Sequence, residues 1–170
     1  SPEALKGIGL NLPEGRIPNQ YDYQMYLMNL ADKKVTPVTK DFNPSVQQTV
    51  WNKVDGQIYF TAENRDYISL YRMNPKDGKI QQLDAKEDLV KNFSMADSSP
   101  VLAYYGQGAM NSDRLYTLDT KKMKQVLVED LSQELLEDVQ LGECHDWNFI
   151  DSKGDTIYGR YYLPPHFDAS

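Results

Sequence analysis

Short apolar runs alternate with turn-forming residues along most of this chain. β-Branched and aromatic residues that are bounded by Asp, Asn, Gly and Pro predict strands. The clearest runs span 47–50, 57–62, 69–73, 79–83, 101–105 and 114–118. The segments 53–56 and 74–78 both end in Asp-Gly, which predicts tight turns with Gly in the left-handed position. We therefore predict an all-β chain built from hairpins.

The pattern repeats at an interval of 45 residues. Tyr26, Tyr71 and Tyr116 are separated by this interval. The same spacing relates Asn29, Asn74 and Asp119, then Lys34, Lys79 and Lys124, then Met28, Met73 and Leu118, and finally Val38, Leu83 and Val128. We expect the register to hold without a gap, with 58–60 (Ile-Tyr-Phe) equivalent to 103–105 (Ala-Tyr-Tyr). A period of about 40–50 residues filled with short strands is typical of β-propeller blades.

Several predicted strands are apolar on both faces. Neighbouring residues of a strand point to opposite sides, so Leu70 and Tyr71 require an apolar neighbour on each side of their sheet. A half-solvated sheet instead alternates apolar and polar residues. A large sandwich would explain the continuous runs but not the fixed period. Stacked propeller blades explain both.

The predicted organisation is a fragment of a propeller, with about three blades of antiparallel four-stranded sheets in residues 1–141. We assign 1–40 to a partial blade whose inner strand is 7–12, 41–85 to one blade, 86–130 to the next and 131–141 to a helical connection. Leu131, Leu135 and Leu136 have the spacing of a short helical turn. Residues 142–170 are expected to form an exit hairpin and a linker. Closed propellers have about four to eight blades, so 170 residues predict part of a longer chain.

Composition removes several classes of partner. A net charge of −7 and a pI of about 4.8 lack the basic footprint of nucleic-acid or anionic-lipid binding. No apolar run approaches the roughly 20 residues of a membrane span, and the start, Ser1-Pro2-Glu3-Ala4, does not resemble a signal peptide. A single cysteine, Cys144, excludes an internal disulfide and a cysteine-based zinc cluster.

Candidate catalytic or metal-binding residues are few. Cys144, His145 and Asp146 are a possible nucleophile, base and acid, but on a strand His145 points away from the other two. His166 is the second histidine, and no Asp-x-Asp-x-Asp-Gly calcium loop occurs. The loop 106–111 lacks phosphate-loop spacing. We therefore assign no catalytic, cofactor-binding or metal-binding residue.

Two further readings concern acidic residues near predicted strand ends. A propeller glycosidase needs two carboxylates about 5–9.5 Å apart across a funnel, and the available acids are Asp55, Glu63, Asp97 and Asp113. Acids at turns are common for solubility alone. The polar stretch 63–66 (Glu-Asn-Arg-Asp) is interpreted as a solvated hairpin loop, with a rim that touches substrate or a neighbouring domain as the alternative.

The stretch from Asp146 to Asp168 (DWNFIDSKGDTIYGRYYLPPHFD) resembles a particular junction. It is similar to the hairpin where the propeller of prolyl oligopeptidase and dipeptidyl peptidase IV-like serine peptidases passes into the α/β-hydrolase domain. The segments 58–63 and 70–73 resemble propeller strands of the same family, and together the resemblance covers about 22–168. It implies that this chain is the C-terminal part of such a propeller, and it favours an extracytoplasmic place, periplasmic or secreted.

The resemblance also implies which parts lie elsewhere. That family carries its nucleophile in a Gly-x-Ser-x-Gly elbow, which does not occur in these residues. Glu137 and Asp138 are not assigned the role of the family's paired glutamates. The implied function is therefore non-catalytic: a scaffold and size-selective gate for peptides that a separate hydrolase domain of the same polypeptide cleaves. A stand-alone propeller-like binding module is the alternative, and a propeller glycosidase fragment is a third. We expect the chain by itself to self-associate.

Overall fold

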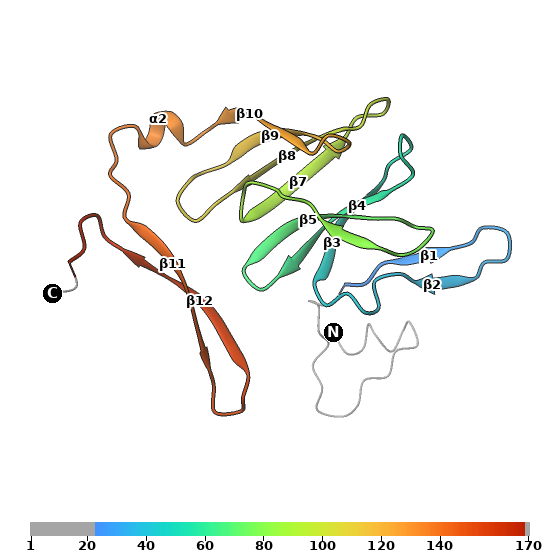
Figure 1. Cartoon of the computed structure of the whole chain (residues 1–170), viewed down its shortest axis with the longest axis horizontal. Helices are drawn as coiled ribbons and strands as arrows, with labels where there is room; N and C mark the ends of the chain where they lie inside the picture. Colours follow the sequence, from blue (N-terminus) through green and yellow to red (C-terminus); the bar gives the residue numbers. More distant parts are fainter. Residues whose placement is uncertain (1–22, 169–170) are drawn as a thin grey trace, which may run out of the picture.

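The computed structural model describes residues 23–168, and within them all elements but one are strands (Figure 1). The elements are β1 Tyr26–Met28, β2 Val35–Pro37, β3 Ser45–Trp51, β4 Ile58–Asn64, β5 Tyr67–Met73, β6 Ile80–Gln82, β7 Leu89–Met95, β8 Val101–Gln107, β9 Arg114–Asp119, β10 Lys124–Asp130, α2 Gln133–Leu136, β11 Glu143–Ile150 and β12 Thr156–Leu163. The all-β prediction and the short helical turn are confirmed. The expected strand at 7–12 lies outside the described residues.

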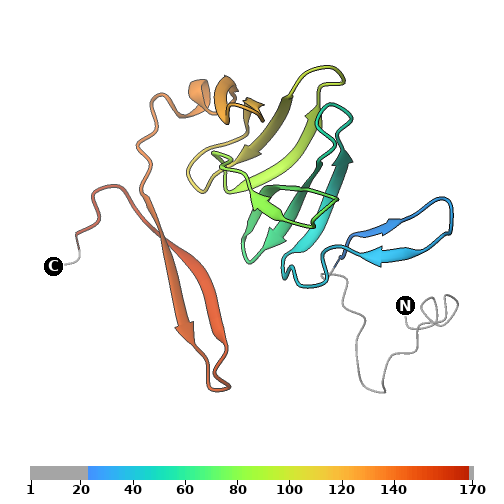
Figure 2. The ribbon, with the colours of Figure 1, turned by 45° about the vertical axis from the view of Figure 1, so that its right-hand side comes forward.

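The strands form two antiparallel four-stranded blades in chain order, β3–β6 and β7–β10 (Figure 2). Strands β1 and β2 form a hairpin before the first blade, and β11 and β12 form another after the second. One parallel pair, Ile68 with Leu89, joins β5 to β7 and so links the two blades. This contact places one end of both blades at a common edge.

The core lies on both sides of β4 and β5. Tyr59 and Leu70, both 0% exposed, pack against the β7–β10 blade, while Phe60 and Tyr71 pack toward β1 and β2. Burying a large apolar side chain contributes about 1.5–3 kcal/mol. The alternating contacts explain why these strands carry continuous apolar runs, and they confirm the two-sided burial predicted from the sequence.

A side-chain amide also connects the first strands of the two blades. Gln48 donates from Nε2 to the Phe93 carbonyl at 2.8 Å and accepts from the Phe93 backbone N–H at 3.2 Å. Gln48 lies in a β-bulge between Val46 and Thr49, where the regular ladder of β3 is interrupted. The bulge turns the Gln48 side chain toward the next blade, where it hydrogen-bonds the backbone of the residue 45 positions later.

The 45-residue repeat is explained by the turn between the third and fourth strands of each blade. Asn29, Asn74 and Asp119 each accept a hydrogen bond through Oδ1 from the backbone N–H two residues later. The position four residues after each has a positive φ: Lys33 at 59°, Gly78 at 70° and Met123 at 54°. The three turns therefore share one backbone shape, although glycine occupies only one of the three left-handed positions.

The gap-free register predicted for the central strands is wrong by one residue. Phe60 pairs with Tyr71, and Tyr104 pairs with Tyr116, so the equivalent of Phe60 is Tyr104 and not Tyr105. The loops after these strands differ in length, since β4 and β5 are joined by two residues and β8 and β9 by 108–113. Gly106 and Gln107, assigned to a loop from the sequence, belong to β8.

Gly106 is buried because β7 passes close to its backbone. A Cβ at this position would lie 2.2 Å from the Leu89 carbonyl oxygen, a separation that no side chain tolerates. The strand therefore continues through Gly106 where a larger residue would force it away from β7.

The outer face of the last blade is exposed. Tyr105, Leu115 and Val126 are 40%, 37% and 51% exposed, whereas Tyr104 and Tyr116 on the opposite face are buried. At about 25 cal/mol per Å², each 100 Å² of such surface favours association by about 2.5 kcal/mol. The corresponding face of the preceding blade is covered by β7–β10.

Substitution at the left-handed turn positions tests the shared turn. Gly78→Ala should lower the free energy of unfolding by about 1 kcal/mol, because alanine adopts positive φ at a cost. Met123→Gly should leave the free energy of unfolding unchanged or raise it by up to about 1 kcal/mol, because glycine adopts a positive φ without that cost. Urea denaturation measures both, with Lys122→Ala in the same turn as the control. Equal losses for Gly78→Ala and Met123→Gly would contradict the shared backbone shape.

Substitution on the exposed face tests self-association. We expect the chain to form dimers or larger species at high concentration, and Leu115→Glu to shift it toward monomer, because a carboxylate would be desolvated in the contact. Sedimentation velocity measures the distribution. Val54→Glu, which places the same charge in an exposed turn, is the control. A strictly monomeric parent chain would show that this face does not drive association.

Candidate functional site

The candidate site is the contact between the β11–β12 hairpin and the blade ends that carry the β4–β5 turn (Figure 1). The hairpin has two different faces. Cys144, Asp146 and Arg160 lie on the face toward the blades, and Trp147, Phe149 and Tyr161 lie on the other. On the outer face Trp147 contacts Phe149, and His145 stacks on Tyr161 at 5.1 Å between ring centres. Polar contacts thus attach the hairpin, and aromatic residues cover its outer side.

Arg160 is the centre of the attachment. Its Nε lies 2.5 Å from Asp66 Oδ2 and its Nη1 lies 2.6 Å from Asp88 Oδ2. Asp146, its cross-strand partner, lies 3.8 Å from Nε. The Arg160 side chain is only 14% exposed, whereas the carboxylates of Asp66, Asp88 and Asp146 remain partly open to water. Charge-assisted hydrogen bonds of this kind are stronger than neutral ones.

Two aromatic contacts reinforce the attachment. The Arg160 guanidinium lies 4.6 Å from the centre of the Tyr67 ring, and the Arg65 guanidinium lies 3.8 Å from the centre of the Tyr158 ring. The Tyr67 hydroxyl is also 3.4 Å from Asp146 Oδ2. Arg65 has a φ of 62°, so the two-residue β4–β5 turn directs adjacent charged side chains toward the hairpin.

The backbone brings the two acids together. Asp66 closes the β4–β5 turn, and Asp88 directly precedes β7. The Asp88 carbonyl accepts a hydrogen bond from the Ile68 N–H at 2.9 Å, beside the single parallel pair that joins the blades. Arg160 therefore contacts the first blade, the second blade and the point where they meet.

The charges set the ionisation of Arg160. Burial alone would lower the pKa of its guanidinium, but the hydrogen bonds to Asp88 and Asp66 outweigh burial and raise that pKa above its ordinary value. Arg160 is therefore a permanent cation. It is suited to holding carboxylates in place and not to proton transfer.

A further carboxylate, that of Glu87, lies buried beside this contact. Its side chain is 2% exposed and accepts hydrogen bonds from the Tyr116 hydroxyl at 2.7 Å and the Asn111 amide at 2.8 Å. Arg114 Nη1 lies 3.8 Å away and also pairs with Asp130. Glu87 thus joins the connection before β7 to the β8–β9 loop. Nothing in its local sequence indicated burial, since it lies among exposed charged residues.

This arrangement perturbs the neighbouring tyrosine. Burial and the hydrogen bond to Glu87 raise the pKa of Tyr116 from 10.0 to about 12. Burial likewise raises the pKa of Tyr104 to about 12. Both phenols are therefore protonated near neutral pH, and Tyr116 acts there as a hydrogen-bond donor.

A cleft of about 460 Å³ lies between the hairpin and the blades. Its lining carries both signs of charge, from Lys86 and Arg160 and from Glu87, Asp88 and Asp146. The acids and bases largely neutralise one another, so the cleft is not a strongly charged funnel.

The side chains of residues 144–146 do not converge. His145 Nε2 pairs with Glu143 Oε2 at 2.8 Å, while Asp146 faces Arg160 and Tyr67. Cys144 is half-buried and pairs across the hairpin with Tyr162. His145 therefore points away from the other two, as strand geometry predicted.

The four acids considered for glycoside hydrolysis have separate surroundings. Asp55 accepts from the Tyr59 hydroxyl at 2.7 Å, Glu63 from the Gln47 amide at 3.2 Å, and Asp113 pairs with Lys91 at 2.6 Å. Asp97 is exposed in the turn between β7 and β8. Within residues 23–168 no three His, Cys, Asp or Glu side chains are grouped to hold a metal ion. His166 lies beyond β12, and Glu137 and Asp138 are exposed after α2.

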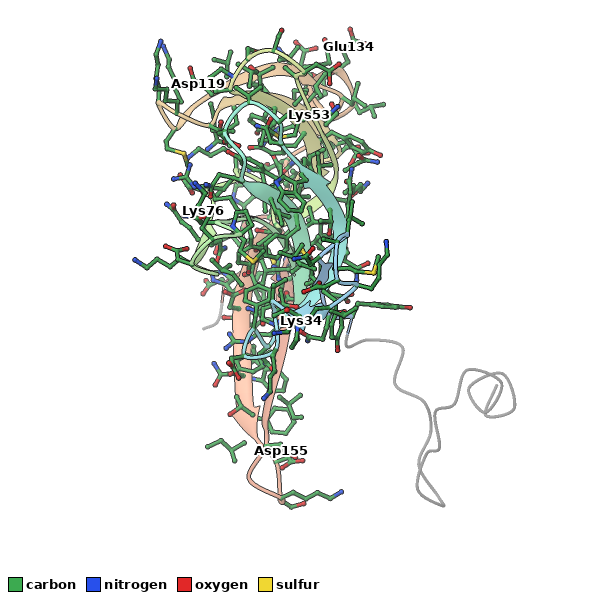
Figure 3. All side chains as sticks on the ribbon, turned by 90° about the vertical axis from the view of Figure 1, so that its right-hand side faces the viewer. Lys34, Lys53, Lys76, Asp119, Glu134 and Asp155 are labelled. Carbon is green, nitrogen blue, oxygen red and sulfur yellow. The ribbon has the colours of Figure 1, made fainter. Side chains whose placement is uncertain are left out.

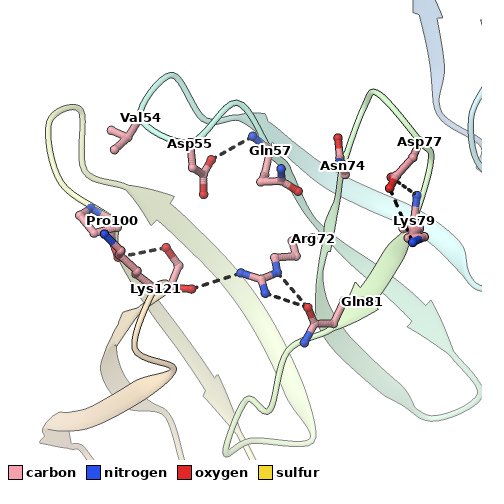
Figure 4. Close-up of a pocket in the computed structure, with 11 residues that line it drawn as sticks. Val54, Asp55, Gln57, Arg72, Asn74, Asp77, Lys79, Gln81, Pro100 and Lys121 are labelled. Carbon is pink, nitrogen blue, oxygen red and sulfur yellow. Dashed lines mark hydrogen bonds and ion pairs between the residues drawn. The ribbon is translucent and has the colours of Figure 1, made fainter.

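The opposite end of the blades carries a separate cleft of about 650 Å³ (Figure 4). Arg72 crosses it, donating to Gln81 Oε1 from Nε at 3.0 Å and from Nη2 at 2.8 Å, and to the Thr120 carbonyl from Nη1 at 3.2 Å. Arg72 thereby connects β5 with the turn after β9. These acceptors use three of its five N–H groups, which supports a structural role between the blades.

No protein-family model matches this sequence. No curated protein matches it either. Solved structures do match. An acylaminoacyl peptidase of Pyrococcus horikoshii superposes with a TM-score of 0.66 and 19% identity, over 86% of this chain and 22% of that one. The apo AtxE2 isopeptidase gives 0.65 and 14%, over 99% and 28%. A puromycin hydrolase in complex with PGG gives 0.57 and 10%, over 82% and 22%.

These matches show the fold. The chain has the architecture of a propeller portion of propeller-bearing peptidases, and it spans less than a third of each matched structure. The fold prediction is confirmed, whereas the division into the ranges 1–40, 41–85, 86–130, 131–141 and 142–170 stays a prediction. Among the described residues no helix is long and apolar enough to span a membrane.

Alkaline unfolding tests the buried phenols. The folded-state pKa of Tyr116 lies above its ordinary value, so the stability that its protonated form supplies is complete below about pH 10 and is lost as the pH rises toward 12. Urea denaturation at pH 9 and at pH values between 10 and 12 should show a falling free energy of unfolding.

The Tyr116→Phe variant separates this residue from the others. It should be less stable than the parent at neutral pH, because Glu87 loses one of its hydrogen-bond donors, and should show a smaller fall above pH 10. Tyr23→Phe, at an exposed phenol, is the control. An unchanged alkaline slope in Tyr116→Phe would contradict the assignment.

Proposed function

We propose that this chain is the non-catalytic propeller portion of a serine peptidase of the prolyl oligopeptidase and dipeptidyl peptidase IV type. The observation that carries the proposal is the aromatic hairpin β11–β12, which ends at Pro164-Pro165 and is docked by charges on one end of propeller blades. The fold likeness to several peptidases supports it. Catalysis would belong to an α/β-hydrolase domain of the same polypeptide, and the chain as given supplies no nucleophile motif.

In this proposal the propeller is a scaffold and a size-selective gate. The hairpin leaves from the blade end that carries the β4–β5 turn, so the catalytic domain would sit at that end (Figure 1). Two blades that share a close-packed apolar core, the first of them buried on both faces, form a rigid wall. A rigid wall beside a catalytic cleft admits short flexible peptides and excludes folded proteins.

A stand-alone binding module is the second candidate. The cleft of about 460 Å³ beside the hairpin favours it, because its lining includes polar groups of both signs that could orient a ligand. A glycosidase fragment is less well supported, since three of its four candidate acids are held by local partners and the fourth is exposed in a turn. The first two functions differ in whether a hydrolase accompanies the propeller.

The coding sequence downstream of residue 170 and a serine-reactive probe test the main proposal. We expect a Gly-x-Ser-x-Gly elbow within about 150 codons, followed by Asp and His, and labelling of the complete protein by a fluorophosphonate. An early stop codon, or further 45-residue repeats without an elbow, would overturn the peptidase assignment and favour the binding module.

The gate predicts a dependence on substrate size. The complete protein should cleave a fluorogenic peptide of a few residues with a kcat/KM at least about tenfold higher than the same sequence inserted in a folded protein, equivalent to about 1.4 kcal/mol in activation free energy. The same sequence in an unfolded long peptide is the control for chain length. Equal cleavage of all three substrates would refute the gate while leaving the peptidase assignment intact.

A further inference from the structure

The hairpin and the blades are joined in a different way from the blades themselves. Blade contacts are made by buried apolar residues such as Leu70 and Leu102. The hairpin instead reaches the blades through Arg160, Asp146 and Tyr158, and most of its large apolar residues are exposed: Trp147, Phe149, Ile150, Ile157, Tyr158, Tyr161 and Tyr162. A two-stranded hairpin alone is marginally stable in water. Its position therefore depends on a few charged contacts.

We propose that Arg160 is the positioning residue that latches the hairpin at a fixed angle on the propeller. The latch consists of Arg160 with Asp66 and Asp88, one acid from each blade, and Asp146 from the hairpin itself. The inference extends the proposed function, because the hairpin would carry the catalytic domain and its angle would set how closely the propeller covers that domain.

The geometry requires the planar guanidinium. Arg160 Nε donates to Asp66 and Nη1 donates to Asp88. Two acids from segments on either side of the blade junction are therefore held by different nitrogen atoms of one rigid group. The ring of Tyr67 lies 4.6 Å from the same guanidinium. A lysine ammonium is a point charge without this fork, so it cannot meet both acids and the ring in one orientation.

The latch lies in the base half of the hairpin. A further contact, Arg65 over the ring of Tyr158, lies closer to the tip. Arg160 and Asp146 are opposite each other in the register, whereas the turn at 151–155 forms its hydrogen bonds within itself. Figure 3 shows Asp155 projecting from the blades, far from Lys53 and Asp119. Rotation about the latch would therefore produce a large displacement at the tip.

Spin labels on the whole chain test the latch. The labels are placed at Lys76→Cys on the first blade and Ser152→Cys at the hairpin tip, with Cys144→Ser to remove the native thiol. Pulsed electron–electron double resonance, which measures the distance between the two spin labels, should give one narrow distance distribution with Arg160 present. Arg160→Gln should broaden it into longer and shorter distances, and Arg160→Lys should broaden it as well. Lys124→Gln, which removes the same charge from an exposed strand, should leave it narrow.

Two results decide the matter. A distribution in Arg160→Gln that superposes on that of the parent would overturn the latch, as would equal broadening in Lys124→Gln. If circular dichroism shows that Arg160→Gln does not fold, the double variant Asp66→Asn and Asp88→Asn removes the acids and keeps the arginine, and it must broaden the distribution for the latch to stand. The measurement needs no peptidase activity, so the latch and the proposed function fail independently.

Discussion

Burial of both faces of β4 and β5 is the constraint on which the rest of the structure depends. Tyr59 and Phe60 are adjacent in sequence and fully buried on opposite sides, so the sheet is stable only between two neighbours. That requirement stacks the blades and generates the repeat, because each blade must offer the next one an equivalent apolar face. It also leaves the final face, with Tyr105 and Leu115, exposed within residues 23–168.

Most of the fold was readable from the sequence, because its signals are local. Asp-Gly turns and apolar runs marked the strands, and the period marked the stacking. The exceptions have physical causes. Lys33 and Met123 adopt a left-handed backbone without being glycine, since side-chain capping by Asn29 and Asp119 defines their turns. The one-residue offset at Tyr104 follows from a loop whose length does not alter the overall period.

The candidate site was largely hidden from the sequence, because its contacts are not local. Arg160 meets partners 72 and 94 residues away, and no spacing rule relates these positions. Residues 63–66 were interpreted as a solvated loop with a contacting rim as the alternative. The contact of Asp66 with Arg160 now favours the rim. Strand alternation did correctly separate His145 from Cys144 and Asp146, because that argument needs only the period of two.

Two different kinds of contact hold the molecule together: apolar packing between the blades, and ion pairs between the hairpin and the blades. Apolar stacking is non-directional and resists separation of the blades, whose buried side chains form two close-packed clusters. The ion pairs of Arg160 are directional and involve few atoms. They therefore set the angle between hairpin and blades more than they resist separation of the two. A rigid propeller with an ion-paired hairpin therefore consists of two bodies whose relative angle is set at one junction. For the proposed gate this arrangement is advantageous, because an intact wall is held at one position over the cleft.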